Sequence, residues 1–252
     1  MVCLVSCAIL YLRIGFVIKG GAVMSGKTMS RSDLLKLAGG RFLMGLFVLA
    51  AIFFLTAWSF SYWQAWMYLA TLFIPMFMLL IYLVFNAPDL LERRMHAREQ
   101  VTEQKWIIAI STLLFIPAFI LPGFDIRFGW SKMPAFLSVA SDVLVFLGYT
   151  LFIIVLRENH YASRIVEVEQ NQKVISSGPY AIVRHPMYVA VILMYVFTPL
   201  ALGSYWGIIP ALTILPSIFF RIRSEEKVLA SELEGYVEYT QKVRHRLIPG
   251  VW

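Results

Sequence analysis

Long apolar segments follow one another along most of the chain, separated by shorter polar segments. Several apolar segments reach or approach the roughly 18–20 residues that a helix needs to cross a bilayer. We predict six transmembrane helices, at Phe42–Tyr62, Ala65–Phe85, Trp106–Leu121, Ala135–Leu156, Met187–Gly203 and Tyr205–Phe220. The apolar runs are continuous and do not alternate, which excludes a closed barrel. The predicted fold class is therefore all-α, an integral membrane helical bundle.

Composition supports a membrane domain and changes little else. Hydrophobic residues make up 60% of the chain and charged residues 15%, whereas a soluble domain is about half apolar and a quarter charged. We expect residues 1–41 to form a cytoplasmic N-terminal segment, and the sequence leaves the start open among Met1, Met24 and Met29. We expect residues 42–252 to form one membrane domain whose motif-bearing core is 157–250. Cys3 and Cys7 both lie in the first segment and predict no disulfide framework.

The basic residues lie almost entirely on one side of the predicted bundle. Of the 22 Lys and Arg residues, only Arg127 and Lys132 fall in loops assigned to the other side. This asymmetry matches the positive-inside rule and predicts that both termini are cytoplasmic. The positive-inside rule accounts for the formal net charge of +7. No basic cluster remains that needs a nucleic-acid partner.

The segment Arg221–Leu247 predicts an amphipathic helix on the cytoplasmic side. Its apolar and aromatic residues recur at steps of three, four or seven, from Ile222 to Leu247. Glu226 falls within this stripe and Glu225 at its edge. Because an unpaired buried charge is costly, we expect at least one of these carboxylates to face a partner.

The stretch "GPYAIVRHPMY", residues 178–188, carries more chemistry than a membrane anchor needs. Gly178-Pro179 predicts a bend, and Pro186 suits the first turn of a helix. That leaves His185 near the N-cap, with free N–H groups at Met187 and Tyr188. A helix N-terminus beside an arginine and a histidine can bind an anion.

Each of these residues also has a simpler interpretation. Arg184 could extend to the membrane interface, His185 could cap the helix, and Arg221 and Glu225 could form an ion pair four residues apart. However, the last two predicted spans form a tight hairpin joined near Ser204. Their cytoplasmic ends are then neighbours, so we predict that residues 180–188 and 221–226 converge in space.

The combined motif resembles the isoprenylcysteine carboxyl methyltransferase family, a group of membrane methyltransferases that also includes phospholipid N-methyltransferases. The resemblance rests on "GPYAIVRHPMYVA" followed by "RSEEKVL" and "EGYVEYTQKVRHRLIPG". It covers mainly Gln172–Pro249. One departure is Ala190, where the family usually has glycine.

The resemblance implies a methyltransferase that uses S-adenosylmethionine and acts on a lipophilic or membrane-borne acceptor. Arg221 would face that acceptor as the catalytic residue. The sequence leaves three classes of acceptor open: an isoprenylcysteine-like carboxylate, a lipid amine and a thiol. The residues implied for the cofactor are Gln172, Lys173, Val174, Ile175, Tyr180, His185, Pro186, Met187, Tyr188 and Glu225.

Two other functions stay open from the sequence. A sterol-type membrane reductase shares the Arg-His-Pro motif and would use NADPH. A transporter or structural protein would need polar residues near the membrane midplane, and only Asp142 approaches that depth. We predict that Asp142 makes a structural contact between helices, and that Asp125 pairs with Arg127 at the surface. The four histidines are scattered, so we predict no metal site.

Overall fold

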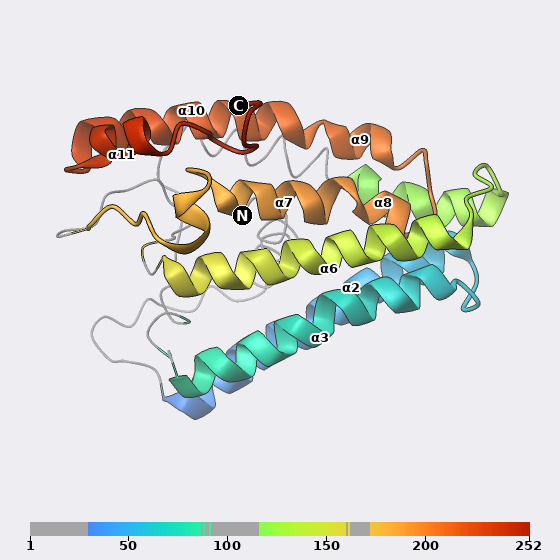
Figure 1. Cartoon of the computed structure of the whole chain (residues 1–252). Helices are drawn as coiled ribbons and strands as arrows, with labels where there is room; N and C mark the ends of the chain where they lie inside the picture. Colours follow the sequence, from blue (N-terminus) through green and yellow to red (C-terminus); the bar gives the residue numbers. More distant parts are fainter. Residues whose placement is uncertain (1–29, 87, 89–90, 92–115, 160, 162–171) are drawn as a thin grey trace.

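The computed structural model describes residues 30–86, 88, 91, 116–159, 161 and 172–252 (Figure 1). No strand occurs among these residues, and every regular element in them is helical. The elements are α2 (Arg31–Ala57), α3 (Trp63–Asn86), a helical stretch at 116–128, α6 (Ala135–Glu158), η1 (Gly178–Ala181), α7 (Pro186–Val196), α8 (Thr198–Ala201), α9 (Ile208–Leu212), α10 (Ile214–Glu232) and α11 (Tyr236–Lys242).

Three of these helices, α2, α3 and α6, are long and apolar enough to cross a membrane. A shorter apolar helical stretch follows at Pro186–Ala201. The chain is therefore an integral membrane protein with an all-helical described part, while the count of six spans stays a prediction. The predicted third span lies mostly outside the described residues, and its described part continues to residue 128 instead of ending at Leu121.

The helix α2 begins at Arg31, earlier than the predicted start at Phe42. Ser30 is its N-cap, and the Ser30 hydroxyl accepts a hydrogen bond from the backbone N–H of Asp33 at 3.2 Å. Serine and aspartate at these positions stabilise a helix start. The prediction began later because it used hydropathy, and residues 31–41 include several polar residues.

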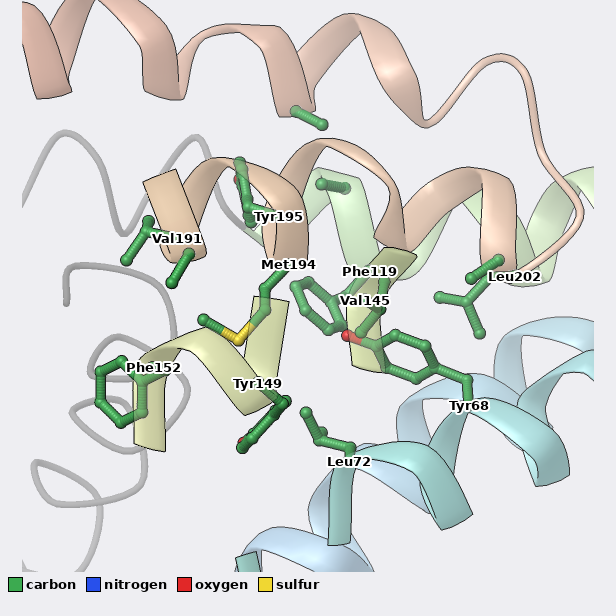
Figure 2. Close-up of a cluster of buried hydrophobic side chains, with 14 of the residues drawn as sticks. Tyr68, Leu72, Phe119, Val145, Tyr149, Phe152, Val191, Met194, Tyr195 and Leu202 are labelled. Carbon is green, nitrogen blue, oxygen red and sulfur yellow. The ribbon is translucent and has the colours of Figure 1, made fainter. Parts of the chain in front are cut away.

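The helices pack in the order α10, α7, α6 and α3, with α2 beside α3 (Figure 1). Figure 2 shows the centre of this arrangement, where side chains of α3, α6 and α7 meet. Val145 of α6 and Val191 of α7 are fully buried, and Tyr149 is 2% exposed. Lipid tails are as apolar as these side chains, so close packing rather than exclusion of water holds such helices together.

The contact between α6 and α7 is close because Gly148 has no side chain. A Cβ atom at position 148 would lie 2.8 Å from Cγ of Met194 and 3.0 Å from the Ala190 carbonyl oxygen. Ala190 itself is fully buried. Gly148 therefore allows α6 to lie close to the backbone of α7 at Ala190.

The predicted single helix over Arg221–Leu247 is wrong. The helix α10 runs from the apolar part of the chain to Glu232, α11 occupies Tyr236–Lys242, and residues 243–252 are not helical. Gly235, with φ +81°, adopts a left-handed conformation that breaks a helix and that glycine adopts without strain. The predicted stripe nevertheless identified buried residues, which include Ile222, Leu233, Tyr236, Val243 and Leu247.

Asp125 and Arg127 do not pair at the surface as predicted. Asp125 is 1% exposed. Its carboxylate accepts hydrogen bonds from the backbone N–H and hydroxyl of Ser131, both at 2.6 Å, and from the Ser204 hydroxyl at 2.5 Å. The Arg127 guanidinium lies 5.4 Å from the ring centroid of Trp58. Asp125 therefore joins two loops at the end of the bundle remote from α11.

Asp142 makes the predicted contact between helices. The Thr71 hydroxyl of α3 donates a hydrogen bond to Oδ2 of Asp142 on α6 at 2.5 Å. Asp142 is 6% exposed, and one carboxylate oxygen is satisfied by a neighbouring helix. The contact links α3 to α6 near the buried core.

Candidate functional site

The polar stretch before α7 folds as its sequence predicts. Gly178 has φ +55° and opens η1, His185 is the N-cap of α7, and Pro186 occupies the first turn. Pro186, Met187 and Tyr188 are all buried there. One detail of the prediction is wrong: the backbone N–H of Tyr188 is not free, because it donates to the His185 carbonyl at 3.0 Å.

Tyr188, Arg221 and Glu225 form a connected group at the interface of α7 and α10. The Tyr188 hydroxyl donates to Oε2 of Glu225 at 2.7 Å and accepts from Nε of Arg221 at 3.0 Å. The phenol of Tyr188 therefore bridges the two groups that were predicted to interact with each other, and it fixes the carboxylate and the guanidinium on one face.

Glu226 is the centre of a second group that the sequence did not assign to the site. Its Oε1 atom lies 2.8 Å from Nε of Arg184 and 3.2 Å from Nε2 of His185, and its Oε2 atom lies 2.7 Å from Nε of Arg246. Burial raises the pKa of the Glu226 carboxyl. Hydrogen bonds from His185 and Arg246, together with the charges of His185 and Arg184, outweigh burial and lower that pKa to about 2.

Arg184 fastens the C-terminal segment instead of extending to the membrane interface. It is 8% exposed, and its Nη1 atom donates to the Val243 and Arg244 carbonyls at 2.9 and 3.0 Å. The backbone N–H of Arg184 donates to the His245 carbonyl at 2.9 Å. Residues 184–185 and 243–246 consequently lie side by side, and the C-terminal segment covers the start of α7.

Tyr180 lies between η1 and α11. Its hydroxyl accepts from Nδ2 of Asn159 at 2.9 Å, and its carbonyl accepts from the Tyr239 hydroxyl at 2.7 Å. Burial, opposed by the Asn159 hydrogen bond and aided by the charge of Glu225, raises the pKa of Tyr180 to about 12. Tyr180 is thus a neutral phenol within electrostatic reach of Glu225.

The segment Gln172–Ile175 has no regular secondary structure. Val174 packs against the cluster of Leu233, Tyr236, Tyr239 and Val243. Gln172, Val174 and Ile175 are partly buried, and Lys173 is exposed. The segment therefore reaches α11, which places it beside the residues that follow Glu225 in the chain.

Tyr236 has a buried hydroxyl that sequence reasoning did not single out. Tyr236 is 4% exposed, and its hydroxyl has no hydrogen-bond partner among the described residues. The sequence placed Tyr236 on the apolar stripe, which correctly predicts its burial. A spacing pattern cannot show that the hydroxyl lacks a partner.

The predicted site residues therefore fall into connected groups at one end of the bundle. The Tyr188 hydroxyl is hydrogen-bonded to both Arg221 and Glu225. His185 contacts Glu226, the residue next to Glu225 in the chain. The charge of Glu225 contributes to the raised pKa of Tyr180. Within the described residues, no group of three His, Cys, Asp or Glu side chains could hold a metal ion. The polar groups here are carboxylates, phenols and guanidinium groups, which suit an organic ligand that carries both a cation and hydrogen-bonding oxygens.

Comparison with known proteins agrees with the resemblance seen in the motif. No curated protein gives a match to the chain. Residues 139–231 match the model of the isoprenylcysteine carboxyl methyltransferase family, a segment that runs from α6 to α10 and includes the Tyr188, Arg221 and Glu225 group. The match begins before the predicted motif and ends before α11. Over these residues the chain is similar to the isoprenylcysteine carboxyl methyltransferase family.

Proposed function

We propose that the protein transfers a methyl group from S-adenosylmethionine to a lipophilic or membrane-borne acceptor. The acceptor would be the carboxylate of an isoprenylcysteine-like compound, a lipid amine or a thiol. The observation that carries the proposal is the hydrogen-bonded group of Tyr188, Arg221 and Glu225, which lies inside the family domain. It offers an anionic group and a cationic group on one face, beside apolar helices.

The buried polar groups of this end fit the cofactor. Among the described residues, Glu225 has a single hydrogen-bond donor, Tyr188, which leaves its Oε1 atom available for an ammonium group. Tyr180, His185, Pro186, Met187 and Tyr188 line the same end, and Gln172–Ile175 would contribute backbone groups. The unpartnered hydroxyl of Tyr236 shows that the protein alone does not satisfy every polar atom here.

When bound, S-adenosylmethionine supplies an electrophilic methyl group on a sulfonium centre. The residues of this chain would bind and orient the two reactants and exclude water, because methyl transfer gains most from positioning and from a dry site. Arg221 would hold an acidic or phosphate-bearing acceptor, since a planar guanidinium suits such groups and the Tyr188 hydroxyl orients its Nε–H.

We further propose that this end of the bundle and both termini face the cytoplasm. The argument is the one-sided distribution of lysine and arginine along the chain. A water-soluble cofactor would then approach from the cytoplasm, and the acceptor would approach from the bilayer.

The proposal is tested by titrating the purified protein in detergent with S-adenosylhomocysteine and, separately, with NADPH. We expect the parent to bind S-adenosylhomocysteine and not NADPH, and we expect His185→Ala and Glu225→Ala each to weaken binding. Lys227→Ala, an exposed change on the same helix, is the control. A parent that binds only NADPH would favour the reductase, and two variants that bind as tightly as the parent would refute the site.

A further inference from the structure

Among the described residues, Tyr236 has the one buried tyrosine hydroxyl at this end without a hydrogen-bond partner. Tyr188 donates to Glu225, Tyr180 accepts from Asn159, and Tyr239 donates to the Tyr180 carbonyl. The Tyr236 hydroxyl is buried with no partner, although the residue is only 4% exposed. A buried hydroxyl in this state costs free energy, and native proteins usually satisfy it.

Tyr236 packs beside one part of the proposed cofactor site. Its ring packs in one cluster with Val174, which belongs to the segment Gln172–Ile175. Its ring centroid is 5.9 Å from that of Tyr239. Burial raises the pKa of Tyr236 well above its ordinary value, and the charges of Glu226 and Glu225 raise it further. Tyr236 is therefore a protonated donor at neutral pH.

The neighbouring charged groups limit what the hydroxyl can bind. Glu226 is already bound by Arg184, His185 and Arg246, so it does not need a further donor. Glu225 is the group proposed to hold the cofactor ammonium. Tyr236 packs beside Tyr239, whose hydroxyl binds the Tyr180 carbonyl, so it lies at the same end of the bundle as Glu225. An amino-acid ligand held there by its ammonium group offers its carboxylate as the hydrogen-bond acceptor.

We propose that the Tyr236 hydroxyl donates a hydrogen bond to the carboxylate of the amino-acid part of the bound cofactor. This inference rests on the proposed function, and it assigns a ligand contact to α11, which lies outside the matched family segment. The hydroxyl is buried in advance and loses little freedom on binding, so it selects ligands that carry an amino-acid carboxylate over ligands that carry the nucleoside alone.

The first test compares the parent with Tyr236→Phe, which removes only the hydroxyl. Both proteins are titrated with S-adenosylhomocysteine and with 5′-methylthioadenosine, which has the nucleoside but no amino-acid part. We expect the variant to bind S-adenosylhomocysteine about ten-fold more weakly and to bind 5′-methylthioadenosine as the parent does. Tyr205→Phe, an exposed change between α8 and α9, is the matched control and should alter neither affinity.

The second test measures thermal unfolding without ligand. Because Tyr236→Phe removes an unsatisfied buried hydroxyl, we expect its melting temperature to equal or exceed that of the parent. Tyr239→Phe removes a hydroxyl that is bound to the Tyr180 carbonyl, so we expect its melting temperature to fall. A lower melting temperature for Tyr236→Phe would show that its hydroxyl has a partner within the protein, and it would refute the proposal.

The binding results separate this inference from the proposed function. Failure of the parent to bind S-adenosylhomocysteine would overturn both. Normal binding by the parent with equally tight binding by Tyr236→Phe would overturn only the role of Tyr236. An equal loss of affinity for both ligands would place the hydroxyl at the nucleoside and overturn its assignment to the carboxylate.

Discussion

The two ends of the bundle both bury carboxylates but satisfy them with different partners. Near the loop that follows α8, Asp125 accepts hydrogen bonds from Ser131 and Ser204. Near α11, Glu226 is bound by Arg184, His185 and Arg246, while the adjacent Glu225 is bound by Tyr188. The first end uses short neutral side chains and backbone, and the second uses longer side chains, which include the two guanidinium groups of Arg184 and Arg246.

This difference indicates which end is built for a ligand. The compact contacts of Asp125 connect loops that are adjacent in space and leave each of its oxygens with a donor. At the α11 end, a carboxylate oxygen of Glu225 and the hydroxyl of Tyr236 keep hydrogen-bonding capacity that the described residues do not use. Ser138 and Asp142 of α6 also keep a buried oxygen without a partner, so the α11 end is distinguished by its grouping of charged and phenolic side chains and not by unused capacity alone.

We expect the largest effect on stability from a substitution that breaks the charged group around Glu226 at the α11 end. Glu226→Ala leaves Arg184, which is 6% exposed as a side chain, without its carboxylate. Removing one partner of a buried pair costs about 3–5 kcal/mol, so we expect a markedly lower melting temperature in detergent. Glu232→Ala, an exposed change on the same helix, is the control. Equal melting temperatures for the parent and Glu226→Ala would contradict the role of this group.

A pH series sharpens the same comparison. The Glu226 pKa falls from the ordinary 4.5 to about 2 on folding. The stability it contributes is present above about pH 4.5 and is lost as the pH falls towards 2, a difference of about 3 kcal/mol. We expect Glu226→Gln to reduce the drop in melting temperature between pH 5 and pH 3. A parent and variant with parallel pH profiles would disprove this linkage.

A smaller effect is expected at the opposite end. Asp125→Asn keeps the shape of the side chain but replaces one acceptor oxygen by an NH₂ group and removes the charge from three hydrogen bonds. We expect a loss of about 1–3 kcal/mol in stability and no change in affinity for S-adenosylhomocysteine. If the folded variant bound the ligand more weakly than the parent, the proposal that only the α11 end takes part in binding would be wrong.

A change of similar size, in turnover instead of stability, is expected for the acceptor. Arg221→Lys keeps the charge but loses the planar fork and the Nε–H bond to Tyr188. We expect turnover to fall roughly ten- to a hundred-fold, about 1.4–2.7 kcal/mol, with a much smaller change in cofactor affinity. Methyl transfer from labelled cofactor into a membrane lipid extract measures the first quantity, and direct titration measures the second. Parallel losses would assign Arg221 to the cofactor.

The sequence predicts the helices and the meeting of the two motif halves because both depend on local patterns. Apolar length predicts α3 and α6, proline predicts the start of α7, and the return of the chain near Ser204 brings Tyr188 towards Glu225. These inferences need only spacing and residue type. They do not require knowledge of which distant side chains meet.

The features that the sequence did not predict depend on such meetings. Arg221 and Glu225 share a helix face, but periodicity cannot show that the Tyr188 hydroxyl lies between them. Arg246 reaches Glu226 because residues 246–248 donate their backbone N–H groups to the Trp252 carbonyl, which folds the C-terminal segment back. No spacing rule describes that return, and the absence of a partner for Tyr236 is likewise visible only in three dimensions.

The glycine at position 148 has a consequence for movement. Because α6 and α7 approach so closely there, sliding one past the other would force backbone into side chain, and we expect the two helices to move as one rigid body. The side-chain hydrogen bonds from Tyr188 to Glu225 and from Arg221 to Tyr188, by contrast, can exchange with those of a ligand. A displacement that admits a lipid tail would then be carried by α10 together with the C-terminal segment, while α6 and α7 serve as the fixed wall.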